Sequence, residues 1–181
     1  LLDEAQKCGV TVAFENVEGF EYLELIKREL GTHAALGYCW DTGHEMCYNF
    51  SMDVPAVYGD RLVCTHLDDN MGMTNPAEMT WHDDSHLMPF DGNNDWERDA
   101  RDLAKTEFAR TRICAETSLG AEKKITDMSD EEISAMVDAL PIAKNPELFT
   151  IERGVMRSYA SLSYADYMVR LHERLKKLAD L

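Results

Sequence analysis

Four side chains of the kind that bind divalent cations each follow a short apolar segment of this chain. They are Glu15, Asp41, His66 and Glu116. Taken singly, a carboxylate after a strand is usually a helix cap, and a lone histidine is usually a hydrogen-bonded structural residue. Four segments that all end in this way predict more, because the carboxyl ends of the strands in a parallel α/β barrel converge on one site. We therefore expect these four residues to bind a metal ion together.

The residue types indicate which metal the site would prefer. Three carboxylates and one imidazole form an oxygen-rich set, which favours Mn, Mg or Co, with Zn as the alternative. Cysteine occupies none of the four positions. A six-coordinate ion with four protein ligands keeps two positions open, which two neighbouring oxygens of a sugar would fill.

Further candidates lie beside this set and in a long polar loop from 68 to 94. His44, three residues after Asp41, is a candidate for a further metal ligand or for a hydrogen-bond donor to substrate. Asp84 and His86 have the spacing of a possible second metal site. The alternative for these two residues is an ordinary solvated loop.

Apolar and amphipathic segments alternate along the chain and would position these side chains. Short, continuous apolar strands between helices are typical of a parallel sheet that is covered on both faces. We therefore predict an α/β domain over residues 1–120. Strands are expected at 10–14, 34–40, 62–65 and 112–115, and helices at 1–7, 20–30, 53–58 and from an N-cap at Asn94.

Residues 121–181 are predicted to form a helical tail that packs on the same domain. Capping-box patterns mark two helix starts, one at Ser129 with Glu132 and one at Ser163 with Asp166. The last helix is expected to bury an apolar stripe that is too short for a coiled coil. The stripe consists of Tyr164, Met168, Leu171, Leu175 and Leu178.

Composition excludes several classes of function. The formal net charge of −16 argues against a nucleic acid or an anionic membrane as the partner, since both require concentrated Lys and Arg. The chain contains no apolar run long enough to span a bilayer. The five cysteines are odd in number and form no CxxC pair, which predicts a reduced, cytoplasmic protein.

Four segments carry a resemblance to a known family. They are Val12-Ala13-Phe14-Glu15-Asn16, Trp40-Asp41-Thr42-Gly43-His44, Thr65-His66-Leu67-Asp68-Asp69 and Cys114-Ala115-Glu116. They resemble the xylose-isomerase-like TIM-barrel superfamily, which includes sugar isomerases, epimerases, inosose dehydratases and apurinic endonucleases. The Asp-Thr-Gly-His segment is the most specific of the four, and the resemblance runs from about residue 8 to residue 120.

The resemblance implies a partial (β/α)8 barrel, in which the four strands are strands five to eight. A half barrel exposes two unpaired sheet edges, so either an N-terminal half is missing upstream or two copies of the chain pair. The resemblance also implies that Glu15 and Glu116 flank the substrate as acid and base, and that His44 contacts the substrate. The segment 84–92 resembles a D-x-H segment before a Gly-rich turn, and its His86 is a further candidate to bind the substrate. The metal ligands that the resemblance implies are the same four residues, Glu15, Asp41, His66 and Glu116.

The leading hypothesis is a metal-dependent sugar isomerase or epimerase that transfers a proton next to a carbonyl through an enediolate. Trp81 and Phe90 are candidates to stack on the sugar ring, or else they anchor the loop. An unphosphorylated sugar or polyol is expected, because no Lys or Arg occurs between Arg61 and Arg98. The alternatives are an inosose-type dehydratase, an apurinic endonuclease with several zinc ions, and a non-catalytic partial barrel that binds metal or sugar.

Overall fold

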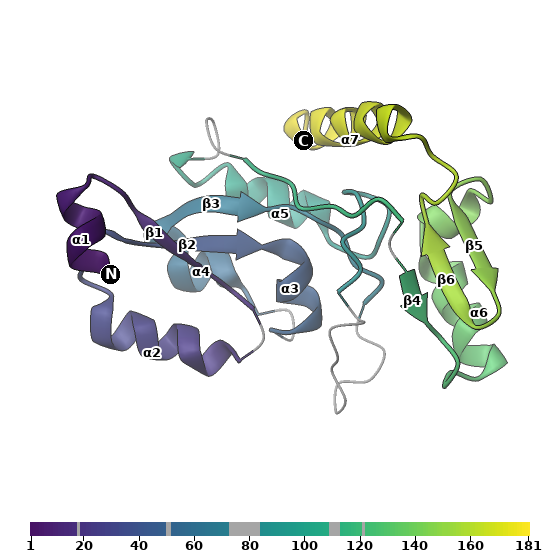
Figure 1. Cartoon of the computed structure of the whole chain (residues 1–181), viewed down its shortest axis with the longest axis horizontal. Helices are drawn as coiled ribbons and strands as arrows, with labels where there is room; N and C mark the ends of the chain where they lie inside the picture. Colours follow the sequence, from purple (N-terminus) through teal and green to yellow (C-terminus); the bar gives the residue numbers. More distant parts are fainter. Residues whose placement is uncertain (18, 50–51, 73–83, 109–112, 121) are drawn as a thin grey trace.

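A three-stranded parallel sheet forms the centre of the N-terminal part of the molecule (Figure 1). The computed structural model describes residues 1–17, 19–49, 52–72, 84–108, 113–120 and 122–181. The strands lie in the order β1 (Val12–Glu15), β2 (Leu36–Asp41) and β3 (Leu62–His66). Each strand therefore ends on one of the predicted metal-binding residues, and parallel pairing places the three ends at one edge of the sheet.

The four predicted helices are present with small differences at their ends, and a further helix, α3, follows β2. Asp53 caps its helix by accepting a hydrogen bond from the Ala56 amide. The next helix is capped by Asp95, whose side chain accepts from the Arg98 amide, and not by the predicted Asn94. The helices are α1 (Leu2–Lys7), α2 (Phe20–Leu30), α3 (Thr42–Cys47), α4 (Val54–Tyr58) and α5 (Trp96–Leu103), with a 3-10 turn at Gly59–Arg61.

One face of the sheet is buried against these helices. Leu36, Tyr38 and Trp40 alternate along β2 and belong to the main apolar core. Trp40 is fully buried, and its indole N–H donates to Glu45 at 2.8 Å. Since side chains alternate between faces, the residues between these three, and Asp41 after them, turn toward the other face of the sheet. The buried core therefore sets the direction in which the predicted ligands point.

The predicted fourth strand at 112–115 is wrong as a full strand. Among the described residues of this segment, Ala115 forms an isolated parallel bridge with Leu67. The bridge consists of hydrogen bonds from the Leu67 amide to Cys114 O at 2.9 Å and from the Glu116 amide to Leu67 O at 3.2 Å. This contact is sufficient to bring Glu116 beside the end of β3. The assignment of these segments to barrel strands five to eight stays a prediction.

The prediction of a wholly helical tail is also wrong. Residues 122–181, here called the C-terminal lobe, contain an antiparallel sheet in the order β4-β6-β5. Arg153 and Gly154 both have positive φ and form a tight hairpin turn, as such turns require. The elements are β4 (Glu122–Lys124), α6 (Asp130–Ala139), a 3-10 turn (Ile142–Lys144), β5 (Phe149–Glu152), β6 (Val155–Ser158) and α7 (Tyr164–Ala179).

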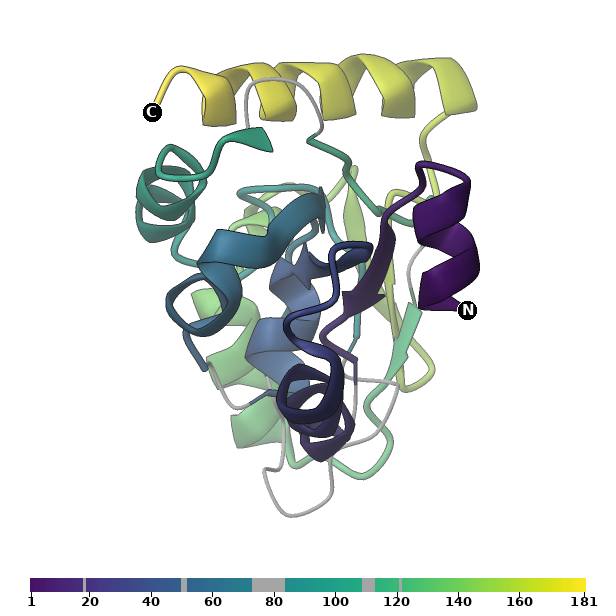
Figure 2. The same cartoon turned by 90° about the vertical axis from the view of Figure 1, so that its left-hand side faces the viewer.

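Helix α7 joins the two parts of the molecule: it runs from the C-terminal lobe back over the N-terminal part in Figure 1 and along the top of the view in Figure 2. Leu178 packs into the core of the parallel sheet, whereas Tyr167 packs into the core of the C-terminal lobe. The predicted stripe is wrong in its first two members, because Tyr164 is 70% and Met168 is 43% exposed, and Tyr167 is buried instead. The predicted caps at Ser129 and Ser163 are both formed. None of the described helices combines the length and apolarity that a membrane span requires.

Candidate metal centre

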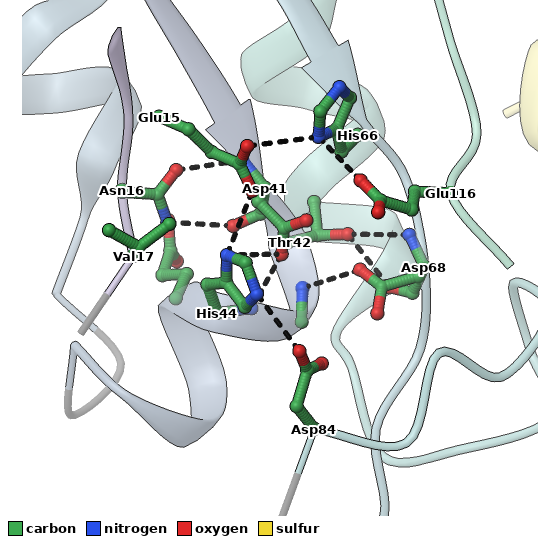
Figure 3. A network of polar contacts seen from close by, with 12 residues as sticks. Glu15, Asn16, Val17, Asp41, Thr42, His44, His66, Asp68, Asp84 and Glu116 are labelled. Carbon is green, nitrogen blue, oxygen red and sulfur yellow. Dashed lines mark hydrogen bonds and ion pairs between the residues drawn. The ribbon is translucent and has the colours of Figure 1, made fainter. Parts of the chain in front are cut away.

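The structure brings the four predicted ligands together (Figure 3). One ligand atom from each of Glu15, Asp41, His66 and Glu116 lies within 4.8 Å of the others. His66 Nδ1 lies 2.6 Å from Glu116 Oε2 and 3.3 Å from Glu15 Oε2. Four donors from three strand ends and one bridged segment therefore surround a single point, as the strand-end rule predicts.

A second group of donors adjoins the first. His44, Asp84 and His86 also place ligand atoms within 4.8 Å of one another. Asp84 Oδ2 lies 2.9 Å from His44 Nε2 and 3.0 Å from His86 Nε2. His44 connects the two groups, because its Nδ1 lies 3.0 Å from Glu15 Oε1. The Asp84 and His86 pair predicted from the sequence thus gains His44 as a third member.

Among the described residues, three buried carboxylate oxygens in and beside these groups lack a hydrogen bond. Buried polar atoms are nearly always hydrogen-bonded, so atoms that are close together but not bonded need another explanation. A shared cation satisfies them, since it is bound by lone pairs and needs no bridging proton. The residues present therefore fit a divalent metal. The oxygens are Asp41 Oδ2 and Asp84 Oδ1 within the groups and Asp68 Oδ2 beside them.

Asp41 is held by two features that fix which oxygen faces the site. As the N-cap of α3, it accepts a hydrogen bond from the His44 amide on Oδ1 at 2.6 Å, which leaves Oδ2 free for a ligand. Asn16 brackets its backbone: Oδ1 accepts from the Asp41 amide at 2.7 Å, and Nδ2 donates to Asp41 O at 2.8 Å. Asn16 is fully buried and was not singled out from the sequence.

Asp68 is a second residue that sequence reasoning missed. Its side chain is fully buried, and Oδ1 accepts a hydrogen bond from the Gly43 amide at 2.9 Å. Oδ2 lies 3.5 Å from His86 Nδ1. A Cβ atom at position 43 would lie 2.3 Å from this carboxylate, so glycine is required there. The Gly43 and Asp68 contact therefore joins α3 to the segment after β3.

The electrostatics of the site favour protonated histidines beside ionised carboxylates. Hydrogen bonds from His44 and His66 lower the pKa of Glu15 to about 2. Burial alone would lower the pKa of His44, but the carboxylates of Asp84 and Glu15 outweigh it and raise the pKa to about 11. Burial raises the pKa of Asp41 to about 6. A metal ion must displace the histidine protons, so its binding is coupled to proton release.

The aromatic candidates have different outcomes. Phe90 packs against Trp96 with ring centroids 5.5 Å apart and an angle of 41° between the ring planes, and the Lys177 ammonium lies 3.8 Å from the Phe90 ring centroid. These contacts are those of the anchoring alternative, and sugar stacking by Phe90 stays a prediction. Trp81 lies outside the described residues.

A hollow of about 860 Å³ lies away from these groups. It opens beside α4 and the end of α5, and its lining includes Asp53, Leu62, Asp102 and Phe108. It contains none of the predicted site residues. The functional argument therefore rests on the two donor groups and not on the size of a cavity.

The family model of the xylose isomerase-like TIM barrel matches residues 1–139. The chain belongs to this family. The match includes all four predicted ligands and both members of the Asp84 and His86 pair. It ends at the last residue of α6, so β5, β6 and α7 lie outside it.

The chain is also similar to an uncharacterised protein of Sinorhizobium fredii, named y4fM, with 35% identity over 101 residues. That alignment covers 54% of this chain and 29% of the relative. The chain thus matches less than a third of the relative's length, and the name of that relative states no activity. No solved structure matches the chain.

Proposed function

We propose that the chain carries the metal centre of a divalent-metal-dependent sugar isomerase or epimerase. The observation that supports this most strongly is the convergence of Glu15, Asp41, His66 and Glu116, in which the buried Asp41 Oδ2 lacks a hydrogen bond from any described residue. The oxygen-rich set favours Mn, Mg or Co, with Zn as the alternative. A small, unphosphorylated sugar or polyol is the substrate class that fits the absence of Lys and Arg between Arg61 and Arg98.

A bound divalent ion would stabilise the negative charge that develops on the sugar oxygens as a proton leaves the neighbouring carbon. Glu15, whose pKa is about 2, stays ionised near neutral pH and is a weak base, so it serves better as a ligand. The Glu116 side chain is 48% exposed, so it is the carboxylate that meets an incoming substrate. We assign the first proton transfer to Glu116, and Glu15 lies on the other side of the substrate as a metal ligand.

His44 and His86 would hold the substrate in place. Their side chains are 11% and 23% exposed, and both contact the Asp84 carboxylate. Asp84 raises the pKa of His86 to about 9, so this imidazolium is charged near neutral pH. Protonated imidazoles donate hydrogen bonds to carbonyl and hydroxyl oxygens, which orients a polyol for proton transfer.

A sugar or inosose dehydratase would use much the same residues and is the nearest alternative. An apurinic endonuclease is favoured by one observation, the second donor group at His44, Asp84 and His86, which suits a site with several ions. The net charge of −16 opposes that reading, because DNA binding requires cationic side chains. A non-catalytic partial barrel that binds metal or sugar is the remaining alternative.

Elemental analysis of the purified protein tests the proposal directly. We expect one Mn, Co or Mg per chain in the wild type and a loss of metal in His66→Ala and Glu116→Gln. His172→Ala, on the exposed face of α7, is the matched control and should keep its metal. Two or more zinc ions per chain would favour the endonuclease alternative. An absence of metal after loading with each ion would refute the metal centre.

A substrate screen in heavy water separates the reactions. Proton transfer next to a carbonyl introduces solvent deuterium at that carbon, which mass spectrometry detects in the recovered sugar. An isomerase or epimerase returns a labelled sugar of unchanged carbon skeleton and oxygen count, whereas a dehydratase returns a product that has lost water. Glu116→Gln is expected to abolish incorporation.

A further inference from the structure

His86 is held in a backbone conformation that non-glycine residues rarely adopt. Its φ is 44°, and that of Phe90, four residues later, is 71°. Both lie in the left-handed region, which costs about 1 to 3 kcal/mol per residue and persists only where the surroundings enforce it. The segment 84–91 therefore needs restraints from outside itself.

Part of that restraint comes from the segment that follows β3. Asp69 and Leu87 exchange two backbone hydrogen bonds of 2.7 and 2.8 Å in an antiparallel bridge. Asn70 adds a third contact, because its side-chain oxygen accepts from the Ser85 amide at 2.8 Å. These contacts hold the residues on either side of His86, whose own carbonyl oxygen accepts from the Ser118 amide at 2.9 Å. The segment after β3 also holds the chain beyond residue 91, because the Asn93 amide donates to Asn70 O at 2.9 Å.

Between these contacts, residues 88 to 91 are held by the C-terminal lobe. Tyr159 Oη accepts a hydrogen bond from the Met88 amide at 2.9 Å and donates one to Asp91 Oδ2 at 2.9 Å. Asp91 is fully buried, and Arg170 Nη2 contacts its two oxygens at 3.0 and 3.2 Å. Arg174 contacts the same carboxylate. The buried Asp91 carboxylate thus contacts one tyrosine hydroxyl and two guanidinium groups, all from the C-terminal lobe.

These contacts differ in origin from the metal-type residues. Tyr159, Arg170 and Arg174 all lie beyond residue 139, where the family match ends. The backbone supports the same attachment, because the Ile142 amide donates to Asp91 O at 3.2 Å. The C-terminal lobe therefore binds residues 88 to 91, the C-terminal end of the segment that contains His86.

We propose that the C-terminal lobe is a clamp that positions His86 in the site. Tyr159 and Arg170 act through Asp91 and the Met88 amide, and they are positioning residues because none of them belongs to either donor group. The proposal rests on the proposed function only in taking His86 as a site residue. It predicts that a loosened clamp changes the surroundings of His86 and of its neighbour His44, while His66 stays as it is.

Imidazole resonances of the metal-free protein test this without any assay of activity. Each Cε1–Hε1 cross-peak is assigned by its loss in a His→Asn variant, and folding is checked by circular dichroism. Tyr159→Phe removes both clamp hydrogen bonds and keeps the ring. We expect it to shift the His86 and His44 cross-peaks, leave those of His66 and His33 in place, and increase amide exchange at Met88 about tenfold.

Three further variants make the result decisive. Arg170→Gln leaves the contact between Arg174 and Asp91 in place, so it is the milder substitution. It replaces Tyr159→Phe in the test if that variant does not fold. Arg170→Lys should restore the wild-type His86 cross-peak. Arg157→Gln breaks an exposed ion pair with Glu122 in the same lobe and should change none of the four cross-peaks.

An unchanged His86 cross-peak in a folded clamp variant would overturn the proposal. Equal shifts of His86 and His66 would also overturn it, since they would indicate general loosening. Neither result depends on metal content or turnover, so a failure of the clamp is distinguishable from a failure of the proposed function.

Discussion

Replacement of Asn16 by alanine should weaken both the fold and the metal centre. The Asn16 amide makes three buried hydrogen bonds, two to the backbone of Asp41 and one of 2.8 Å to Asn49. Asn16→Ala leaves the Asp41 N–H and C=O without these partners in a fully buried place. Each stranded buried polar group costs about 1 to 3 kcal/mol. We therefore expect a loss of about 2 to 4 kcal/mol in the free energy of unfolding.

Urea unfolding of the metal-free protein measures this loss, and titration with the metal measures the effect on the site. Asn145→Ala is the matched control, because its side chain accepts one hydrogen bond, from the Glu147 amide, in an exposed turn. It should cost less than about 1 kcal/mol. Since Asn16 holds the strand end that presents Asp41, Asn16→Ala should also bind metal at least tenfold more weakly. Equal free energies of unfolding for the two variants would show that the hydrogen bonds between Asn16 and Asp41 do not stabilise the fold by this amount.

Further predictions concern pH, sterics and metal removal. Burial raises the pKa of Asp69 to about 6 and of Asp99 to about 7, and the Asp84 carboxylate raises that of His86 to about 9. The folded state thus keeps protons that the unfolded chain releases over this range. The free energy of unfolding of the metal-free protein should therefore fall from pH 4 to pH 9. A series of thermal melts in which stability rises over that range would contradict this prediction. Gly43→Ala should abolish metal binding and destabilise by about 1 to 3 kcal/mol, seen by elemental analysis and urea unfolding, because its Cβ would collide with the Asp68 carboxylate. Removal of the metal with a chelator should lower the melting temperature of the wild type, and the chelator should have no effect on His66→Ala.

Much of the parallel sheet and its ligands is predictable because the signals are local. A short apolar run bounded by a polar residue and glycine marks a strand, and the residue that ends it is read directly from the chain. Glu15, Asp41 and His66 end their strands for this reason. Helix α2 has the predicted bounds at Phe20 and Leu30, because its apolar period and closing glycine are equally local.

The errors occurred where a distant partner decides the structure. The segment before Glu116 has the apolar composition of a strand, yet its described part forms only one bridge with Leu67. The hairpin of β5 and β6 was missed because its alternation is short and lies between strong helix signals. It is stabilised by apolar contacts with α6 and α7 in the core of the C-terminal lobe, which no local window contains.

The sequence by itself determined the donor types, their places at the strand ends and the family of the chain. These depend on local periodicity and on short motifs such as Asp41 to His44. Only the tertiary structure decided that Asn16 and Asp68 support the site, and that Tyr159 and Arg170 grip the segment of His86. Tyr159 and Asp91 are 68 residues apart, and their contact exists only because helix packing closes that distance. Long-range hydrogen bonds of this kind follow from how elements pack, and a linear pattern carries no record of them.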